Sequence, residues 1–140
     1  MTANGSEARA EVVELAFPAS TELVTLARYA AATVAARAGF DVETIEDLRL
    51  AVDELCAAVG PFGQDSCIRV ELVRRGGVVR VSCWSDPIGA DGPVGPVESD
   101  WQPGELAVQL LGALTDRHGF ERRRDRPSGW LEIERDPVSR

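Results

Sequence analysis

Lysine is absent from this chain of 140 residues, in which all 15 basic residues are arginine. The phosphate-binding motif G-x-x-x-x-G-K-[ST] requires a lysine, so its absence excludes a P-loop nucleotide site. Potential metal ligands are also scarce, because the chain has a single histidine, His118, and three widely spaced cysteines, Cys56, Cys67 and Cys83. A zinc site needs more ligands at closer spacing, so we expect no metal centre. We interpret all three cysteines as buried small apolar side chains in a reducing compartment.

Long apolar runs are missing as well, since no stretch approaches the roughly 18 residues that a membrane span needs. Residues 1–7 have neither the basic start nor the apolar segment of a secretory signal peptide. We therefore expect a cytoplasmic protein without a membrane partner. The net charge of -8 opposes direct nucleic-acid binding, because phosphate backbones repel an acidic domain. An acidic surface suits a basic protein partner instead.

The predicted secondary structure follows from hydrophobic spacing and turn residues. We expect a disordered stretch at 1–10 and one domain over residues 11–136. Its predicted elements are a strand at 12–17, helices at 21–38 and 41–59, strands at 68–73 and 78–84 joined by a Gly-Gly turn, a third helix from about 105, and strands at 117–124 and 129–135. This order, β-α-α-β-β-loop-α-β-β, does not alternate strands with helices. It predicts an α+β fold, a two-layer α/β sandwich with a mostly antiparallel sheet and about three helices on one face.

Each predicted helix has an apolar stripe with steps of three and four residues. The first stripe consists of Leu23, Leu26, Ala27, Ala30 and Val34. The second, which is the most regular, consists of Ile45, Leu48, Val52, Leu55 and Val59. The third consists of Leu106, Leu110, Ala113 and Leu114. We expect these stripes to face the sheet.

Residues 85–104 contain four prolines and four glycines and show no periodicity. A structureless stretch of this length in a compact domain is often a lid or a binding loop. Trp101 lies within it, and we expect this side chain to fold over a groove or to meet a partner. Trp84 and Trp130 lie in predicted strands, so we place both in the core.

Two carboxylates are candidates for chemistry. Glu54 lies about 120° from the centre of the second helix's stripe. It is either an ordinary solvated acid or a carboxylate that lines a site between this helix and the long loop. Asp86 ends a strand at the mouth of that loop, where it can accept a hydrogen bond from a ligand amine or cap a turn.

Four arginines cluster near the last predicted turn, at 122–124 and 126. They can form a patch for phosphate or for an acidic partner. The other interpretation is the solvated end of a β-hairpin, with its charge balanced by neighbouring acids such as Glu121.

Two segments together resemble one known family. They are FPAS at residues 17–20, followed by a helix that carries Arg28, and DLRLAVDELC at residues 47–56. The first resembles the start, and the second the N-box helix, of the GHKL (Bergerat) ATPase fold, in particular its anti-sigma factor and serine kinase branch of the RsbW type. The resemblance covers about residues 11–135. It implies the GHKL form of the sandwich, and a homodimer that forms along an antiparallel sheet edge.

The resemblance implies a nucleotide site whose boxes are degenerate here. Glu54 matches the family's general base, which activates a serine hydroxyl of a partner protein. The asparagine that holds Mg²⁺ four residues later is replaced by Ala58, which offers no oxygen to a hard cation. Asp86 matches the aspartate that binds the adenine amine, and Gly89 and Gly104 are what remains of the glycine boxes. Glu105 stands beside the phosphate position that Gly104 would serve, so ATP or ADP binding with Mg²⁺ is weakened.

The same resemblance implies the partners. Arg28 matches an arginine that contacts both a sigma factor and an anti-anti-sigma (STAS) protein, and we add Leu23 and Trp101 to the partner-binding residues. We therefore expect an anti-sigma factor that sequesters an alternative sigma factor, with little or no kinase activity. The alternative is an active ATP-dependent kinase of its STAS partner. A third hypothesis is a small-ligand sensor that has reused the empty nucleotide pocket.

Overall fold

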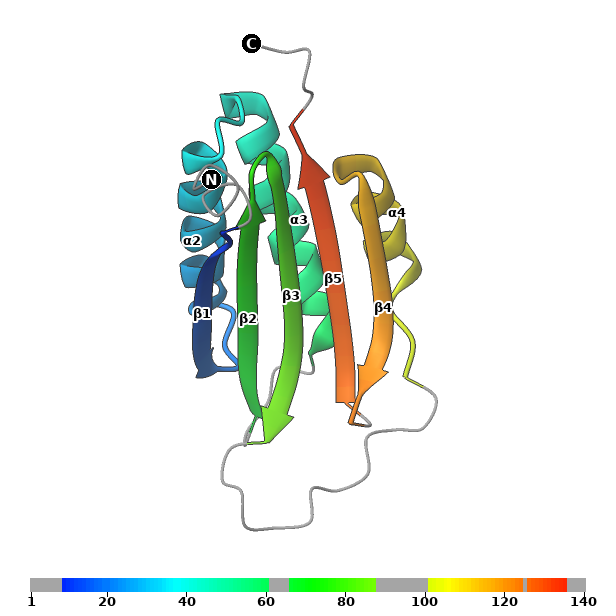
Figure 1. Cartoon of the computed structure of the whole chain (residues 1–140). Helices are drawn as coiled ribbons and strands as arrows, with labels where there is room; N and C mark the ends of the chain where they lie inside the picture. Colours follow the sequence, from blue (N-terminus) through cyan, green and yellow to red (C-terminus); the bar gives the residue numbers. More distant parts are fainter. Residues whose placement is uncertain (1–8, 61–65, 88–100, 125, 136–140) are drawn as a thin grey trace.

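The chain forms one antiparallel sheet with helices on one of its faces (Figure 1). The computed structural model describes residues 9–60, 66–87, 101–124 and 126–135. Within these ranges the elements are β1 (Glu11–Pro18), α2 (Val24–Arg37), α3 (Val42–Val59), β2 (Ser66–Arg75), β3 (Val78–Pro87), α4 (Glu105–Leu114), β4 (Arg117–Arg123) and β5 (Arg126–Glu134). The strand order is β1-β2-β3-β5-β4, and every neighbouring pair is antiparallel. The predicted two-layer α+β sandwich and its element order are confirmed, whereas most of the predicted disordered stretch 1–10 lies outside the described residues.

The sheet has one covered face and one open face because its strands alternate apolar and polar residues. In β2, for example, Ile68, Val70 and Leu72 are fully or almost fully buried under the helices, whereas Arg69 is exposed on the other face. Within the described residues no helix covers that second face (Figure 1). We call it the open face.

Local signals in the sequence explain the ends of several elements. Asp41 is the N-cap of α3, and its Oδ1 accepts a hydrogen bond of 2.8 Å from the backbone N–H of Thr44. Gly39 ends α2 with a φ of 87°, and Gly76 forms the tight β2–β3 turn with a φ of 58°. Glycine reaches these angles without the steric cost that a Cβ would add. The predicted Gly-Gly turn between β2 and β3 is confirmed.

The predicted stripe of the first helix is only partly right. The buried residues of α2 are Val24, Ala27, Ala31, Val34 and Ala35. Leu26 is 49% exposed instead. In a helix so rich in alanine, two neighbouring stripes are almost equally apolar. Contact with α3 and the sheet selects the one that allows the closest approach.

The stripe predicted for the third helix is also wrong in part. Ala107 and Leu111 are the buried residues of α4, whereas Leu106 is 66% exposed. Nearly every position of this ten-residue helix is apolar, so periodicity alone does not select a face. The predicted last turn, at 125–129, is shorter in the structure, because β5 already begins at Arg126.

The three cysteines do not share one environment. Cys56 of α3 and Cys83 of β3 are fully buried, with their Sγ atoms 3.6 Å apart. The hydrogen bond to Cys56 and burial raise the pKa of the Cys83 thiol. Cys67 is only partly buried and lies on the open face, opposite Asp86. The expectation that all three are buried is therefore wrong for Cys67.

This difference predicts a selective thiol reaction. Because thiolate is the reactive form, the burial and raised pKa of Cys83 protect the buried pair, whereas Cys67 remains accessible. Titration of the folded protein with a chromogenic disulfide should show one fast thiol per chain, and three in denaturant. Cys67→Ser should remove the fast phase. Fast reaction of more than one thiol in the folded state would contradict this packing.

None of the helices among the described residues is long and apolar enough to span a membrane.

Candidate functional site

The candidate site lies at one end of the helix layer. Figure 1 shows that α3 ends, β3 ends and α4 begins at this same end of the molecule. Helix α3 lies over the middle of the sheet, since Cys56 contacts Cys83 of β3 and the Leu55 side chain packs onto Gly129 of β5. Helices α2 and α4 both pack against α3. The fold therefore holds α3 in contact with four other elements.

Glu54 lies on the side of α3 that is turned toward α4. Its neighbour Asp53 faces α2, because it forms an ion pair with Arg28 of that helix. Each helical residue turns by about 100°, so Glu54 points away from this pair. Glu54 is partly exposed and forms no ion pair or side-chain hydrogen bond with any residue that the structure describes. Ala58, one turn later, places a methyl group on the same side.

Ser85 is a polar residue of this region that the sequence analysis did not select. It is opposite Ile68 in the β2–β3 register and is only 1% exposed, so it faces the helices. Its hydroxyl has no hydrogen-bond partner among the described residues. Buried hydroxyls are rarely left unpaired, so this oxygen marks a place for a polar contact. The strand alternation of Val79, Val81 and Cys83 was the signal that would have identified Ser85.

Asp86 lies on the opposite face of the sheet from Glu54. It shares the open face with Arg69, whose Nε donates a hydrogen bond of 2.7 Å to Asp86 Oδ2. The structure therefore does not bring Asp86 and Glu54 into one pocket. Gly89, the second predicted nucleotide contact, lies outside the described residues.

Gly104 is the N-cap of α4, with an extended backbone and no side chain to cap the helix. The backbone N–H groups at such an end attract anions. Glu105, the first residue of α4, is exposed and already places a carboxylate there. This charge complements the helix dipole, but it repels a second anion such as phosphate.

The described residues do not fit a magnesium–nucleotide complex. Ala58 offers no oxygen to the metal, Glu105 opposes phosphate at the start of α4, and Asp86 lies on the other face of the sheet. Nor do any three histidine, cysteine, aspartate or glutamate side chains in the described ranges gather closely enough to hold a metal ion. We therefore derive no phosphoryl-transfer step from this geometry.

The predicted partner-binding residues are not gathered in one place. Arg28 is held on α2, with Nε and Nη1 each 3.4 Å from an oxygen of Asp53, and Nη2 donating a hydrogen bond of 2.7 Å to Thr25 Oγ1. Leu23 is partly buried against the core. Trp101 packs edge-on against Phe120 of β4, at 6.2 Å between ring centroids. The Arg28 side chain is 32% exposed, so only this part of it can contact a partner.

Exposed apolar side chains lie on α2 and α3 on the outer side of the helix layer. Leu26 and Tyr29 of α2 are 49% and 59% exposed, and Leu50 of α3 is 46% exposed. The guanidinium of Arg49 lies 5.7 Å from the Tyr29 ring and links the two helices. We call Leu26, Arg28, Tyr29, Arg49 and Leu50 the α2–α3 patch. Residue spacing does not indicate this patch, because it places Leu26 on the predicted buried stripe.

Comparison with known families agrees with this fold. The family described as histidine kinase-like ATPase domain matches residues 17–131, so the chain belongs to that family. The family includes RsbW-type anti-sigma factors, and the sheet with its three described helices is consistent with the GHKL fold. No curated protein matches the chain.

Proposed function

We propose that this protein is an anti-sigma factor. In this proposal it sequesters an alternative sigma factor of RNA polymerase, is countered by an anti-anti-sigma STAS protein, and has little or no kinase activity. The proposed protein is a cytoplasmic homodimer that pairs along a sheet edge, for which β1 and β4 are the available strands.

The observation that carries the proposal is the α2–α3 patch. It combines apolar side chains with the arginine that matches the family's partner contact, and large exposed apolar residues are typical of protein interfaces. Arginine suits such a site because its planar fork can bind a partner's carboxylate through two nitrogens. The net charge of -8 would also draw a basic partner toward this domain.

The choice between a binding protein and a kinase depends on α3. Ala58 occupies the position that matches the family's metal-holding asparagine, and phosphoryl transfer relies on the charge of the metal. This replacement favours a binding protein. One observation favours the alternative kinase: Glu54 is partly exposed and has no partner among the described residues, so its carboxylate is free to accept a proton.

Two measurements test the proposal. Pull-down from the native cytoplasm should recover a sigma factor in a stable complex. Calorimetry with ATP and Mg²⁺ should detect no binding with a dissociation constant below about 1 mM. Tight nucleotide binding together with phosphate transfer to a STAS partner would establish the kinase instead. Recovery of no sigma factor, with each sigma factor of the organism also failing to bind when purified, would reject the anti-sigma function.

A further inference from the structure

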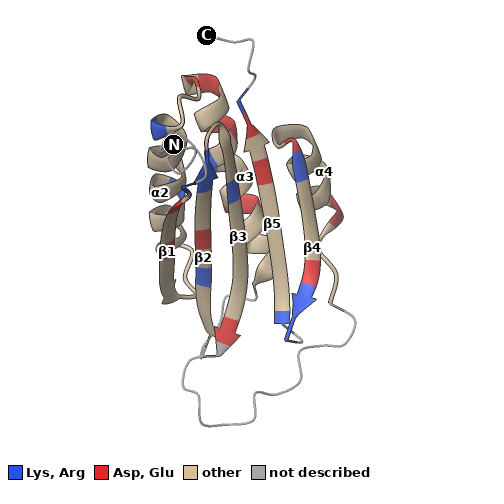
Figure 2. Ribbon diagram, viewed as in Figure 1, with Lys and Arg blue, Asp and Glu red and all other residues tan. Residues whose placement is uncertain are grey.

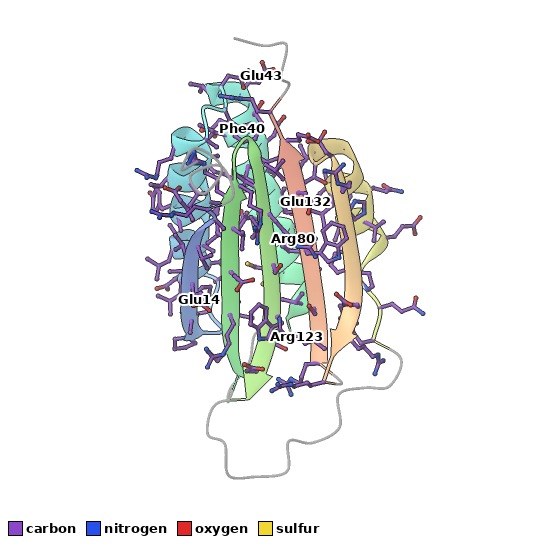
Figure 3. The ribbon with its side chains drawn as sticks, viewed as in Figure 1. Glu14, Phe40, Glu43, Arg80, Arg123 and Glu132 are labelled. Atoms are coloured by element: carbon purple, nitrogen blue, oxygen red, sulfur yellow. The ribbon has the colours of Figure 1, made fainter. Side chains whose placement is uncertain are left out.

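The open face of the sheet contains a groove over β3, β4 and β5. The groove has a volume of about 310 Å³. Its lining includes Arg80, Ser82, Glu121, Arg123, Ser128 and Trp130. It lies on the opposite side of the sheet from Glu54 and α3, so it is separate from the candidate site described above. Figure 3 shows Arg80, Glu132 and Arg123 projecting from this open face.

Two arginine–tryptophan stacks lie on the open face at the groove, whose lining includes Arg80, Arg123 and the Trp130 ring. The guanidinium carbon of Arg80 lies 4.2 Å from the ring centroid of Trp130, and that of Arg123 lies 3.9 Å from the ring centroid of Trp84. Both tryptophans, which were expected in the core, are therefore on the open face, and that prediction is wrong. The core beneath the covered face is filled by other side chains of the strands and helices, most of them aliphatic.

Small residues beside these stacks create the hollow. Trp130 lies directly over Gly119, where a Cβ would come within 2.7 Å of the indole nitrogen. Ser128 and Ser82 are opposite Trp84 and Trp130 respectively in the β3–β5 register, so short side chains stand beside the large ones. The groove is therefore lined by the hydroxyl groups of Ser82 and Ser128 together with the Trp130 ring.

The charges within the groove are incompletely paired. Arg80 binds Glu132 with a distance of 3.1 Å between Nη1 and Oε2. Within the described ranges, Arg123 has no carboxylate partner and Glu121 has no cationic partner. One groove therefore contains an uncompensated positive group and an uncompensated negative group. Figure 2 shows both signs of charge at the C-terminal end of β4.

We propose that this groove binds a small zwitterion, namely a free α-amino acid. Arg123 and the hydroxyls of Ser82 and Ser128 receive its carboxylate, Glu121 receives its ammonium group, and its side chain lies against Trp130. Arginine binds carboxylates through a planar fork, and the stack on Trp84 holds the guanidinium in place. The volume is near the lower end for small-molecule sites, which suits a ligand of this size.

Two other ligand classes agree less well with the groove. A simple anion such as phosphate leaves Glu121 unpaired and is repelled by it. Nucleic-acid bases need free aromatic faces for stacking, whereas arginines already cover Trp84 and Trp130. Because the groove is open to solvent, its ion pairs are screened, and we expect weak binding near the millimolar range. The proposal does not depend on the anti-sigma function.

Titration with individual L-amino acids tests the proposal in the intact chain. The chain has three tryptophans, so NMR resolves three indole N–H signals. At least one amino acid should shift the signals of Trp84 and Trp130 with saturation, and leave that of Trp101 unchanged, because Trp101 packs on Phe120 of the sheet's covered side. No saturable shift with any of the twenty, equal shifts of all three signals, or tighter binding of inorganic phosphate would each overturn the proposal.

Variants of the two charged residues assign their roles. Glu121→Gln should weaken binding of the amino acid at least about tenfold, but leave binding of its N-acetyl derivative unchanged, because that derivative has no ammonium group. Arg123→Gln should weaken binding of both compounds. Glu14→Gln is the matched control, since Glu14 is an exposed carboxylate on β1, away from the groove (Figure 3). Equal loss with Glu121→Gln and Glu14→Gln would contradict the assignment.

Discussion

Replacing Gly129 with alanine is expected to lower the free energy of unfolding by about 1–3 kcal/mol, the usual cost of overpacking a filled interior. A Cβ at this position would lie 2.7 Å from Cδ1 of Leu55 and 2.9 Å from the ring of Phe120. Leu55 is fully buried and Phe120 packs against the core, so making room for the Cβ would disturb the contacts of both side chains. Urea unfolding followed by circular dichroism measures the difference.

Gly112→Ala is the matched control for that experiment. Gly112 lies within α4, and its new Cβ would meet only Cε1 of His118 at 3.7 Å, an ordinary contact. Alanine is the better helix former, so this variant should gain up to about 1 kcal/mol. Equal effects of Gly129→Ala and Gly112→Ala would show that loss of glycine flexibility, rather than the contact with Leu55, controls the result.

Arg28→Glu is expected to weaken capture of the sigma factor at least about tenfold, which corresponds to 1.4 kcal/mol. The substitution removes the cation of the α2–α3 patch that matches the family's partner contact. It also places a second carboxylate beside Asp53, which lies 3.4 Å from Arg28 in the native protein. Glu54→Ala should leave capture unchanged, because Glu54 is turned away from the Arg28–Asp53 pair. Surface plasmon resonance with the recovered sigma factor provides both affinities.

A charge swap distinguishes a direct contact of Arg28 with the partner from a role of Arg28 in the packing of α2 and α3. In the double variant Arg28→Glu with Asp53→Arg, the ion pair between α2 and α3 is rebuilt with reversed sign. If Arg28 contacts the partner, the double variant folds normally but still fails to capture the sigma factor. Full recovery of capture would show that Arg28 only supports the packing of the two helices. Loss of capture in Glu54→Ala with Arg28→Glu unaffected would place the interface elsewhere.

The two surfaces proposed here lie on opposite sides of the sheet. The α2–α3 patch belongs to the helix layer, whereas the groove beside Arg123 and Trp130 belongs to the open face. The two proposals can therefore be tested separately, and neither experiment uses a variant from the other surface.

Patterns within a few residues were enough to predict most elements of this fold. The stripe of α3, the cap formed by Asp41, and the glycines that end α2 and turn the β2–β3 hairpin all depend on neighbours in the chain. Such interactions are already present in a short segment, so periodicity and capping residues reveal them. The element order then predicted the two layers and the antiparallel sheet.

Choices between two faces required the packed fold. The sequence marks Asp86 as the polar end of β3, but its place opposite Cys67 puts it on the open face and leaves Ser85 facing the helices. A shift of one residue moves a strand side chain to the other side of the sheet. Trp84 and Trp130 are apolar enough for a core, yet aliphatic side chains already fill it. The alternation within β3 separates these two sets of side chains, but which set the helices cover depends on contacts between residues far apart in the chain.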